Sequence, residues 1–144
     1  MSRTPLQAAR VYYDSLLPGR RAELMEILDP HVVLELPEGF PGGGGIYRGL
    51  KAYLEDYLYR LYGGFDMDTD VEEYIASGDR VIALGWHHGR AVATGQRVQV
   101  RFAHAWTVRD GRLVSGLMYT DTGALCGAAH SRPAPEGASS APQG

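Results

Sequence analysis

Two runs of alternating apolar and polar residues flank an Asp-Gly pair between Arg97 and Thr122. In the first run every second residue is apolar apart from one histidine, and this series is Val98, Val100, Phe102, His104, Trp106 and Val108. Alternation with a period of two is typical of a strand with one buried face, and Asp110-Gly111 is typical of a two-residue turn. The pattern therefore predicts a β-hairpin with a histidine on its apolar face.

The turn at Asp110-Gly111 also predicts the register of this hairpin. The expected opposite pairs are Trp106 with Ser115, His104 with Leu117, and Phe102 with Tyr119. In this register Leu117, Tyr119 and Asp121 share the apolar face with His104. Several ionisable groups on one apolar wall are costly unless they pair with each other, with water or with a ligand. His104 is therefore either a hydrogen-bonded core residue or part of a functional site.

The preceding strand, predicted over residues 79–93, decides which residues lie beside His104. A three-residue loop at residues 94–96 puts Trp86 opposite His104 and turns His88 toward the same face, whereas a two-residue turn would pair His104 with Gly85. We take the three-residue loop because it brings the apolar faces together. Two histidines without a patterned carboxylate are a weak indication of a metal site, so we expect no metal and no cofactor.

Helical spacing of apolar residues predicts three helices before these strands, over residues 4–17, 21–28 and 50–62. Thr4-Pro5 is typical of a helix start, and Asp29-Pro30 of a helix end. Tyr12 and Tyr13 are adjacent, so we expect one of them in the core or pocket and the other partly exposed. In the third helix Tyr53 and Tyr57 form an aromatic stripe that should pack in the core beside a pocket. Shorter strands are expected at residues 31–36 and 65–75.

Residues 37–49 contain six glycines and two prolines and are predicted to form a loop. Four consecutive glycines suggest a phosphate-binding loop, but no Gly-Lys-Ser/Thr sequence follows them. The alternative is a mobile or tightly bent lip that allows close approach to another group.

Composition narrows the class of protein. The 144 residues carry a net charge of −3, which gives no basic surface for nucleic acid or for a membrane. No apolar stretch is long enough for a signal peptide or a membrane span, and the single Cys126 excludes an internal disulfide. We expect a cytoplasmic protein with one domain over residues 1–129 and a disordered tail over residues 130–144.

Helices followed by mostly antiparallel strands predict an α+β domain with a curved mixed sheet and helices on its concave face. Four motifs resemble the nuclear-transport-factor-two-like superfamily, especially SnoaL-like proteins, over about residues 6 to 125. They are Tyr12-x3-Leu16-x2-Gly19, Asp29-Pro30-His31-Val32-Val33, Gly44-x2-Tyr47-Arg48-Gly49 and Trp106-x3-Asp110-Gly111-Arg112. The resemblance implies a cone-shaped α+β barrel with a pocket. It does not decide the reaction, because this fold hosts isomerases, dehydratases, cyclases and binding modules.

The resemblance also implies roles for individual residues. Tyr12 stands where ketosteroid isomerases have the tyrosine of their oxyanion hole. Leu36 and Ala103 stand where those enzymes have their two aspartates, which argues against steroid-type isomerisation. The pattern of SnoaL-like polyketide cyclases fits better, with Asp121 as the acid/base aspartate and His104 on the preceding strand. That pattern implies cofactor-free chemistry on a small hydrophobic carbonyl or polyketide-type substrate.

In this chemistry Asp121 moves a proton beside a carbonyl group, while His104 or a tyrosine hydroxyl supports the developing enolate. Glu35 or Glu38 could replace Asp121 as the base. The residues expected to line the pocket are Tyr12, Glu35, Tyr57, Trp86, His88, Phe102, Trp106, Leu117 and Tyr119.

The expected partners are a small hydrophobic molecule and a second copy of the chain. We expect the homodimer to form through the sheet face that carries Gln99, Arg101, Ala103 and Ala105. The same fold also serves non-catalytic ligand-binding modules, so catalysis and pure binding both stay open.

Overall fold

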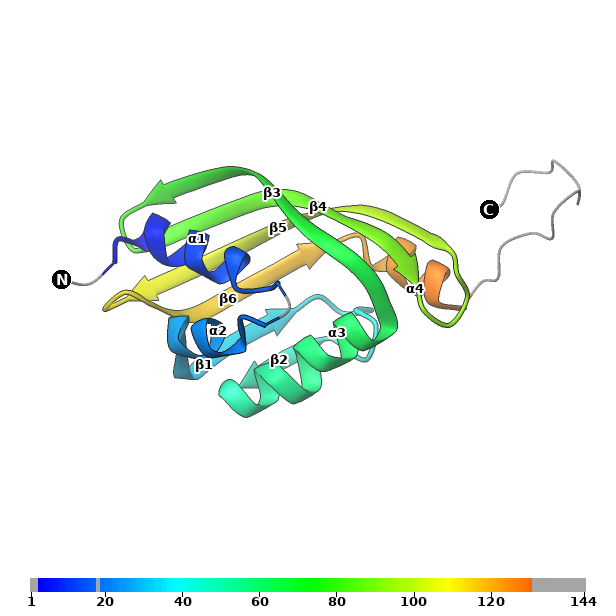
Figure 1. Cartoon of the computed structure of the whole chain (residues 1–144), viewed down its shortest axis with the longest axis horizontal. Coiled ribbons are helices and arrows are strands. Elements are labelled where there is room, and N and C mark those ends of the chain that lie inside the picture. Colours follow the sequence, from blue (N-terminus) through cyan, green and yellow to red (C-terminus); the bar gives the residue numbers. More distant parts are fainter. Residues whose placement is uncertain (1–2, 18, 131–144) are drawn as a thin grey trace, which may run out of the picture.

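The structure is a computed structural model that describes residues 3–17 and 19–130. Its elements are α1 (Pro5–Asp14), α2 (Arg21–Ile27), β1 (Leu28–Leu36), β2 (Gly45–Arg48), η1 (Ala52–Leu58), α3 (Tyr59–Gly64), β3 (Phe65–Ser77), β4 (Arg80–Ala91), β5 (Arg97–Arg109), β6 (Arg112–Thr120) and α4 (Thr122–His130). The strands form a curved sheet in the order β2-β1-β6-β5-β4-β3, in which β1 and β6 are parallel and the other neighbours antiparallel. Helices α1 and α2 lie over one face, which we call the inner face (Figure 1). The predicted α+β class is confirmed.

Helix α1 begins where the sequence predicts. The Thr4 hydroxyl accepts the Gln7 backbone N–H, and the Gln7 side chain accepts the Thr4 N–H, so two otherwise unpaired donors of the first turn are satisfied. The helix ends at Asp14, and Pro18 of the predicted stop lies outside the described residues. Tyr12 and Tyr13 are 1% and 8% exposed, so the expectation that one would be partly exposed is wrong. Because α1 lies deep in the curved sheet and contacts strands β3 to β6, more than one stripe of the helix is buried.

The glycine-rich segment is not a loop throughout. Residues 45–48 form β2, which pairs with β1 from Leu36↔Gly45 to Val33↔Arg48. The positive φ angles that accompany the glycines, such as 88° at Gly42, explain why the composition alone suggests a loop. The following helix is present but spans residues 50–64, two residues beyond the predicted end at 62, and its centre is the π-helix η1. Tyr53 and Tyr57 of η1 are buried in the core.

Both predicted strand registers are wrong. The Asp110-Gly111 turn is present, with φ of 51° and 74° and the flanking pair Arg109↔Arg112. A bulge between Thr107 and Val108 then shifts the pairing by one residue, so that Met118, instead of Leu117, lies opposite His104.

Between β4 and β5 the connection comprises residues 92–96, and Ala83, instead of Trp86, lies opposite His104. Because side chains alternate between faces, an odd shift moves every side chain of a strand to the other face. His87 therefore lies on the inner face, and Trp86 and His88 lie on the outer one.

Helix α4 was not predicted. It follows β6 directly, and the Asp121 carboxylate accepts the Ala124 backbone N–H at 2.9 Å, as an N-cap residue does. Leu125 and Ala128 are buried, and the Thr94 hydroxyl donates to the Ala128 carbonyl. The helix includes His130, which had been assigned to the tail, and the remaining tail residues 131–144 lie outside the described residues.

Candidate functional site

Two histidines lie close together on the inner face of the sheet. His87 of β4 and His104 of β5 are each 4% exposed. The Phe102 ring packs against both, with its centroid 4.7 Å from that of His87 and 4.2 Å from that of His104. Gly85 lies opposite Phe102, and a Cβ atom there would come within 2.9 Å of the Phe102 Cζ. Glycine at this position therefore leaves room for the Phe102 ring, and the two imidazoles are themselves neighbours with centroids 6.1 Å apart.

His104 is hydrogen bonded to Tyr13 of α1. The Tyr13 hydroxyl lies 2.6 Å from His104 Nδ1, and the two rings are stacked at an interplanar angle of 12°. The same hydroxyl accepts the Trp106 Nε1–H at 2.9 Å. Trp106 is fully buried and lies opposite Gly116, whose missing side chain leaves space for the indole. Two residues of β5 thus converge on the phenolic oxygen of one residue of α1.

The direction of these hydrogen bonds follows from counting donors. The indole N–H can only donate, so Tyr13 is its acceptor. The hydrogen of the Tyr13 hydroxyl then points to His104 Nδ1, its one acceptor among the described residues. His104 consequently accepts at Nδ1 and carries its own hydrogen on Nε2. The arrangement leaves one lone pair of the Tyr13 oxygen for a further donor.

A second chain of hydroxyl groups leads to His87. The Tyr62 hydroxyl of α3 lies 2.6 Å from the Thr69 Oγ1 of β3. Thr69 Oγ1 in turn lies 3.0 Å from His87 Nδ1. Thr69 and His87 are direct partners in the β3–β4 pairing, so the sheet itself holds this contact.

Burial keeps both networks uncharged at neutral pH. It lowers the pKa of His87 from 6.5 to about 4, and the neighbouring His88 adds to this shift. Burial, and to a lesser degree His87, lowers the pKa of His104 well below its usual value. Burial likewise raises the pKa of Tyr13 well above its usual value, and raises that of Tyr62. The site therefore offers neutral hydrogen-bonding groups and no fixed charge in its interior.

A cavity of about 850 Å³ lies beside these groups, between the end of α1, the helix over residues 50–64 and β3. Its apolar lining comprises Leu16, Leu17, Leu54, Leu58, Phe65 and Met67. Its hydroxyl groups belong to Tyr13, Tyr59, Tyr62 and Thr69. Charged residues, Arg21, Asp66, Asp68 and Asp70, complete the lining. The volume, and an apolar wall combined with polar and charged groups, suit a small-molecule site.

The cavity brings together other residues than the sequence predicted. None of the predicted pocket residues lines it, although His104 reaches it through Tyr13. Phe102 and Trp106 pack around His104, and Tyr12 and Tyr57 lie in a buried tyrosine cluster. In that cluster the Tyr12 and Tyr53 hydroxyls share a hydrogen bond of 2.5 Å.

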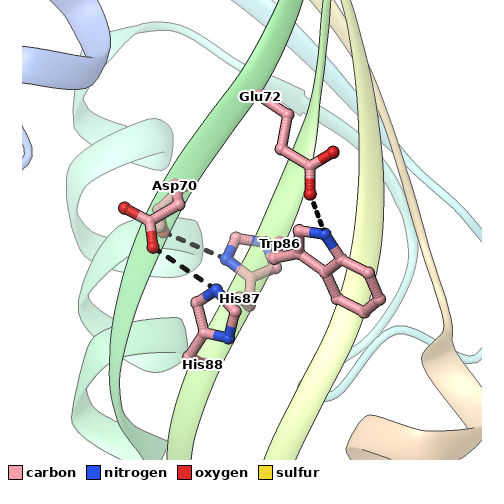
Figure 2. A network of polar contacts seen from close by, with 6 residues as sticks. Asp70, Glu72, Trp86, His87 and His88 are labelled. Carbon is pink, nitrogen blue, oxygen red and sulfur yellow. Dashed lines mark hydrogen bonds and ion pairs between the residues drawn. The ribbon is translucent and has the colours of Figure 1, made fainter.

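The outer face holds several of the other predicted residues (Figure 2). His88 Nε2 lies 3.3 Å from the Asp70 carboxylate, and the Trp86 indole N–H donates to Glu72. The Arg101 guanidinium lies 4.1 Å from the Trp86 ring centroid. Leu117, Tyr119 and Glu35 also belong to this face. These contacts are surface contacts that are screened by water.

The predicted carboxylates do not enter the cavity either. Asp121 is exposed at the start of α4, and Glu35 and Glu38 are exposed as well. The expectation that His104, Trp86 and Asp121 border one cavity is therefore wrong, and the two register shifts are the physical reason.

Three residues of the site were missed, namely Tyr62, Thr69 and His87, and Tyr13 had been left open as the alternative to Tyr12. The alternative two-residue turn at Thr94-Gly95 has the same strand parity as the structure and would have placed His87 inside. For Tyr62 and Thr69 no sequence pattern distinguishes a cavity residue from a core residue.

In the described residues, no group of three or more His, Cys, Asp or Glu side chains is arranged to hold a metal ion. None of the helices over the same residues is both long enough and apolar enough to cross a membrane.

The chain belongs to the SnoaL-like domain family, whose model matches residues 9–116. Its fold is similar to that of an NTF2-like protein from Burkholderia thailandensis, with 28% identity, a TM-score of 0.81, and coverage of 90% of this chain and 99% of the other. TerC, crystallised with polyporic acid, is similar with 25% identity, a TM-score of 0.78, and coverage of 88% and 98%. A candidate SnoaL-like polyketide cyclase from Jannaschia, at 19% identity, a TM-score of 0.78 and coverage of 92% and 99%, shares the fold. A comparison with curated proteins finds no match.

Proposed function

We propose that the protein binds a small hydrophobic carbonyl or polyketide-type compound in the 850 Å³ cavity and moves a proton on it without a cofactor. The observation that carries this proposal is Tyr13, a lining residue of the cavity whose hydroxyl is hydrogen bonded to buried His104 and Trp106. A hydroxyl held by an imidazole behind it is an arrangement suited to general acid/base catalysis.

The proton would move in one coupled step. A proton of the substrate passes to the free lone pair of the Tyr13 oxygen, while the hydrogen already on that oxygen passes to His104 Nδ1. The substrate becomes an enolate and His104 an imidazolium, so charge and protons balance. Tyr13 stays neutral because it gains one proton as it loses the other, and the Trp106 N–H keeps its hydroxyl hydrogen directed toward His104. In the reverse transfer, His104 returns its proton to Tyr13 and Tyr13 donates a proton to another atom of the enolate, which gives an isomerised or cyclised product.

The low pKa of His104 limits the substrates from which Tyr13 and His104 can remove a proton. Each unit by which a pKa is lowered costs about 1.4 kcal/mol when the imidazolium forms. Only a substrate with an acidic proton, such as one between two carbonyl groups, compensates for this cost. The low pKa of His104 also favours the second candidate function, a binding module that holds its ligand through Tyr13 without proton transfer. TerC, a relative of the same fold, was crystallised with polyporic acid, which supports an oxygen-bearing organic ligand in either case.

The keto–enol interconversion of benzoylacetone, followed by its ultraviolet absorbance, tests this proposal. We expect the protein to accelerate the interconversion and Tyr13→Phe to reduce the acceleration by about a hundredfold or more, because the relay oxygen is lost. Tyr59→Phe is the matched control, since Tyr59 lines the cavity but is 77% exposed, and it should keep the rate within about twofold.

His104→Gln tests the same chain from its other end and should reproduce the loss. Binding of benzoylacetone without any acceleration by the wild-type protein would favour the binding module. Acceleration that survives Tyr13→Phe would assign the proton transfer to another group, with the carboxylates that line the cavity, Asp66, Asp68 and Asp70, as the remaining bases.

A further inference from the structure

The cavity has a second polar region that the proposed proton transfer does not use. Tyr62 and Thr69 line the cavity from α3 and β3, whereas Tyr13 lines it from α1. Behind Thr69 lies His87, which is 4% exposed and whose Nδ1 is 3.0 Å from Thr69 Oγ1. A hydroxyl group backed by a buried imidazole thus occurs a second time, on different elements and here as a pair of hydroxyls.

The hydrogen-bonded series Tyr62–Thr69–His87 differs from the one around Tyr13 in its donors. Tyr13 accepts from an indole, which can only donate, so its own hydrogen has one direction. No such donor holds Tyr62 among the described residues, where its hydroxyl has Thr69 as hydrogen-bonding partner. Thr69 carries a single hydrogen between two neighbours, and neutral His87 either donates or accepts at Nδ1, depending on its tautomer.

Two arrangements of the chain are therefore consistent with the same heavy-atom positions. In one, Tyr62 donates to Thr69, Thr69 donates to His87, and the Tyr62 oxygen offers lone pairs to the cavity. In the other, His87 donates to Thr69, Thr69 donates to Tyr62, and the Tyr62 hydrogen is free for the cavity. The two arrangements differ only in the positions of their hydrogens. A ligand can therefore select either arrangement without moving the heavy atoms of Tyr62, Thr69 or His87.

We propose that Tyr62 is a second ligand-recognition residue of this cavity, which binds a second oxygen of the ligand, either a carbonyl or a hydroxyl group. Thr69 and His87 are its positioning residues. The inference rests on the proposed ligand-binding cavity and narrows the ligand class. The ligand is a hydrophobic molecule with two separate oxygen functions, one that meets Tyr13 and one that meets Tyr62.

Binding of naphthol and of the dihydroxynaphthalene isomers to the full-length protein, measured by calorimetry, tests this assignment. The two kinds of probe share one apolar body and differ in the second oxygen. At least one dihydroxy isomer should bind the wild-type protein about tenfold more tightly than naphthol, because one additional hydrogen bond is made in a mostly apolar site. Tyr62→Phe should abolish this advantage and leave the affinity for naphthol within about twofold.

Thr69→Val and Thr69→Ser form a matched pair that separates positioning from packing. Valine keeps the size of threonine but removes the hydroxyl, so most of the tenfold advantage should be lost. Serine keeps the hydroxyl and should retain the advantage. A merely structural role of Thr69 would change the affinities for both probes together and leave their ratio unaltered.

The assignment would be overturned if no dihydroxynaphthalene bound the wild-type protein more tightly than naphthol. It would also be overturned if the tighter binding persisted in Tyr62→Phe. These outcomes are distinct from failure of the proposed proton transfer, which is measured with benzoylacetone and Tyr13→Phe. Selectivity that depends on Tyr62 without any keto–enol acceleration would leave a binding module with two recognition groups. Absence of binding for every probe would overturn both proposals.

Discussion

At the scale of residues, the interior of the site is built from groups that are ionisable but uncharged. His87 and His104 both pack against Phe102 and are each hydrogen bonded to a hydroxyl group through Nδ1. No buried side-chain nitrogen or oxygen of the described residues lacks a hydrogen-bonding partner. Such a network is stable only while both imidazoles stay neutral, because a charge in an apolar interior is costly.

The state of His87 predicts a pH dependence of stability. Its pKa is about 4 in the folded protein and 6.5 without burial, so between these values the unfolded chain binds a proton that the native chain does not. The free energy of unfolding should therefore rise with pH, being highest above the unfolded pKa and falling as the pH decreases toward the folded one. His87 alone should lower it by about 2 kcal/mol between about pH 7 and about pH 5. Urea denaturation at the two pH values measures this difference.

His87→Gln is the test variant, since glutamine can still bond to Thr69 but does not titrate. The difference between the two pH values should shrink by about 2 kcal/mol in this variant. His31→Gln removes an exposed histidine and is the control that should behave as the wild type. An unchanged pH dependence in His87→Gln would mean that His87 is charged or exposed in the native protein.

At the scale of elements, the β5–β6 hairpin sets the geometry around Tyr13. The bulge after the turn brings Gly116 opposite Trp106. A Cβ on Gly116 would lie 2.7 Å from Trp106 Cζ3 and 2.8 Å from Met118 Cε. Since the buried indole donates to Tyr13, the pairing of two strands positions a residue on a helix.

Gly116→Ala should therefore destabilise the protein, because the added methyl group overlaps a rigid ring with no space to move. We expect a loss of about 1–3 kcal/mol in the free energy of unfolding, measured by urea denaturation. Gly127→Ala is the control: this glycine lies in α4 with no atom near its Cβ position, and alanine has the higher helix propensity. Equal stability of Gly116→Ala and the wild type would contradict the register of this hairpin.

At the scale of the whole molecule, the helices cover one face of the sheet and leave the other open (Figure 1). Large apolar side chains on the open face are exposed, among them Ile46 at 54%, Ile82 at 37% and Tyr119 at 53%. Ala103 and Ala105 lie between them on β5 and allow close approach of another surface. A surface of this kind is typical of an interface.

We propose that two copies of the chain form an isologous homodimer through this face, around Gln99, Arg101, Ala103 and Ala105. Ala103→Glu should raise the dissociation constant by about tenfold or more, because a two-fold axis brings the two new charges together. Analytical ultracentrifugation measures the change, and Ala22→Glu on the exposed side of α2 is the control. A wild-type protein that stays monomeric at high concentration would remove this prediction.

Local features of the sequence were sufficient for much of the fold. The capping residues Thr4 and Gln7, the Asp110-Gly111 turn and the alternation along residues 97–108 act over a few neighbouring residues, so each can be recognised in the sequence without the partner strand. The helices before the long strands, most strands and the α+β class follow from such features, whereas α4 and the short strand β2 were missed.

The composition of the site depended on the tertiary structure. A strand has a side-chain period of two, so the bulge between Thr107 and Val108 and the longer connection before β5 exchanged the inner and outer residues of whole strands. His87 replaced His88 inside, and Asp121 became the cap of α4. The sequence by itself determined which elements form, because propensity and capping are local. Only the packing of α1 and α3 against the sheet decided that the Tyr13 hydroxyl meets His104 and that the Tyr62 hydroxyl is linked to His87 through Thr69 beside one cavity. That packing depends on a register which no local pattern encodes.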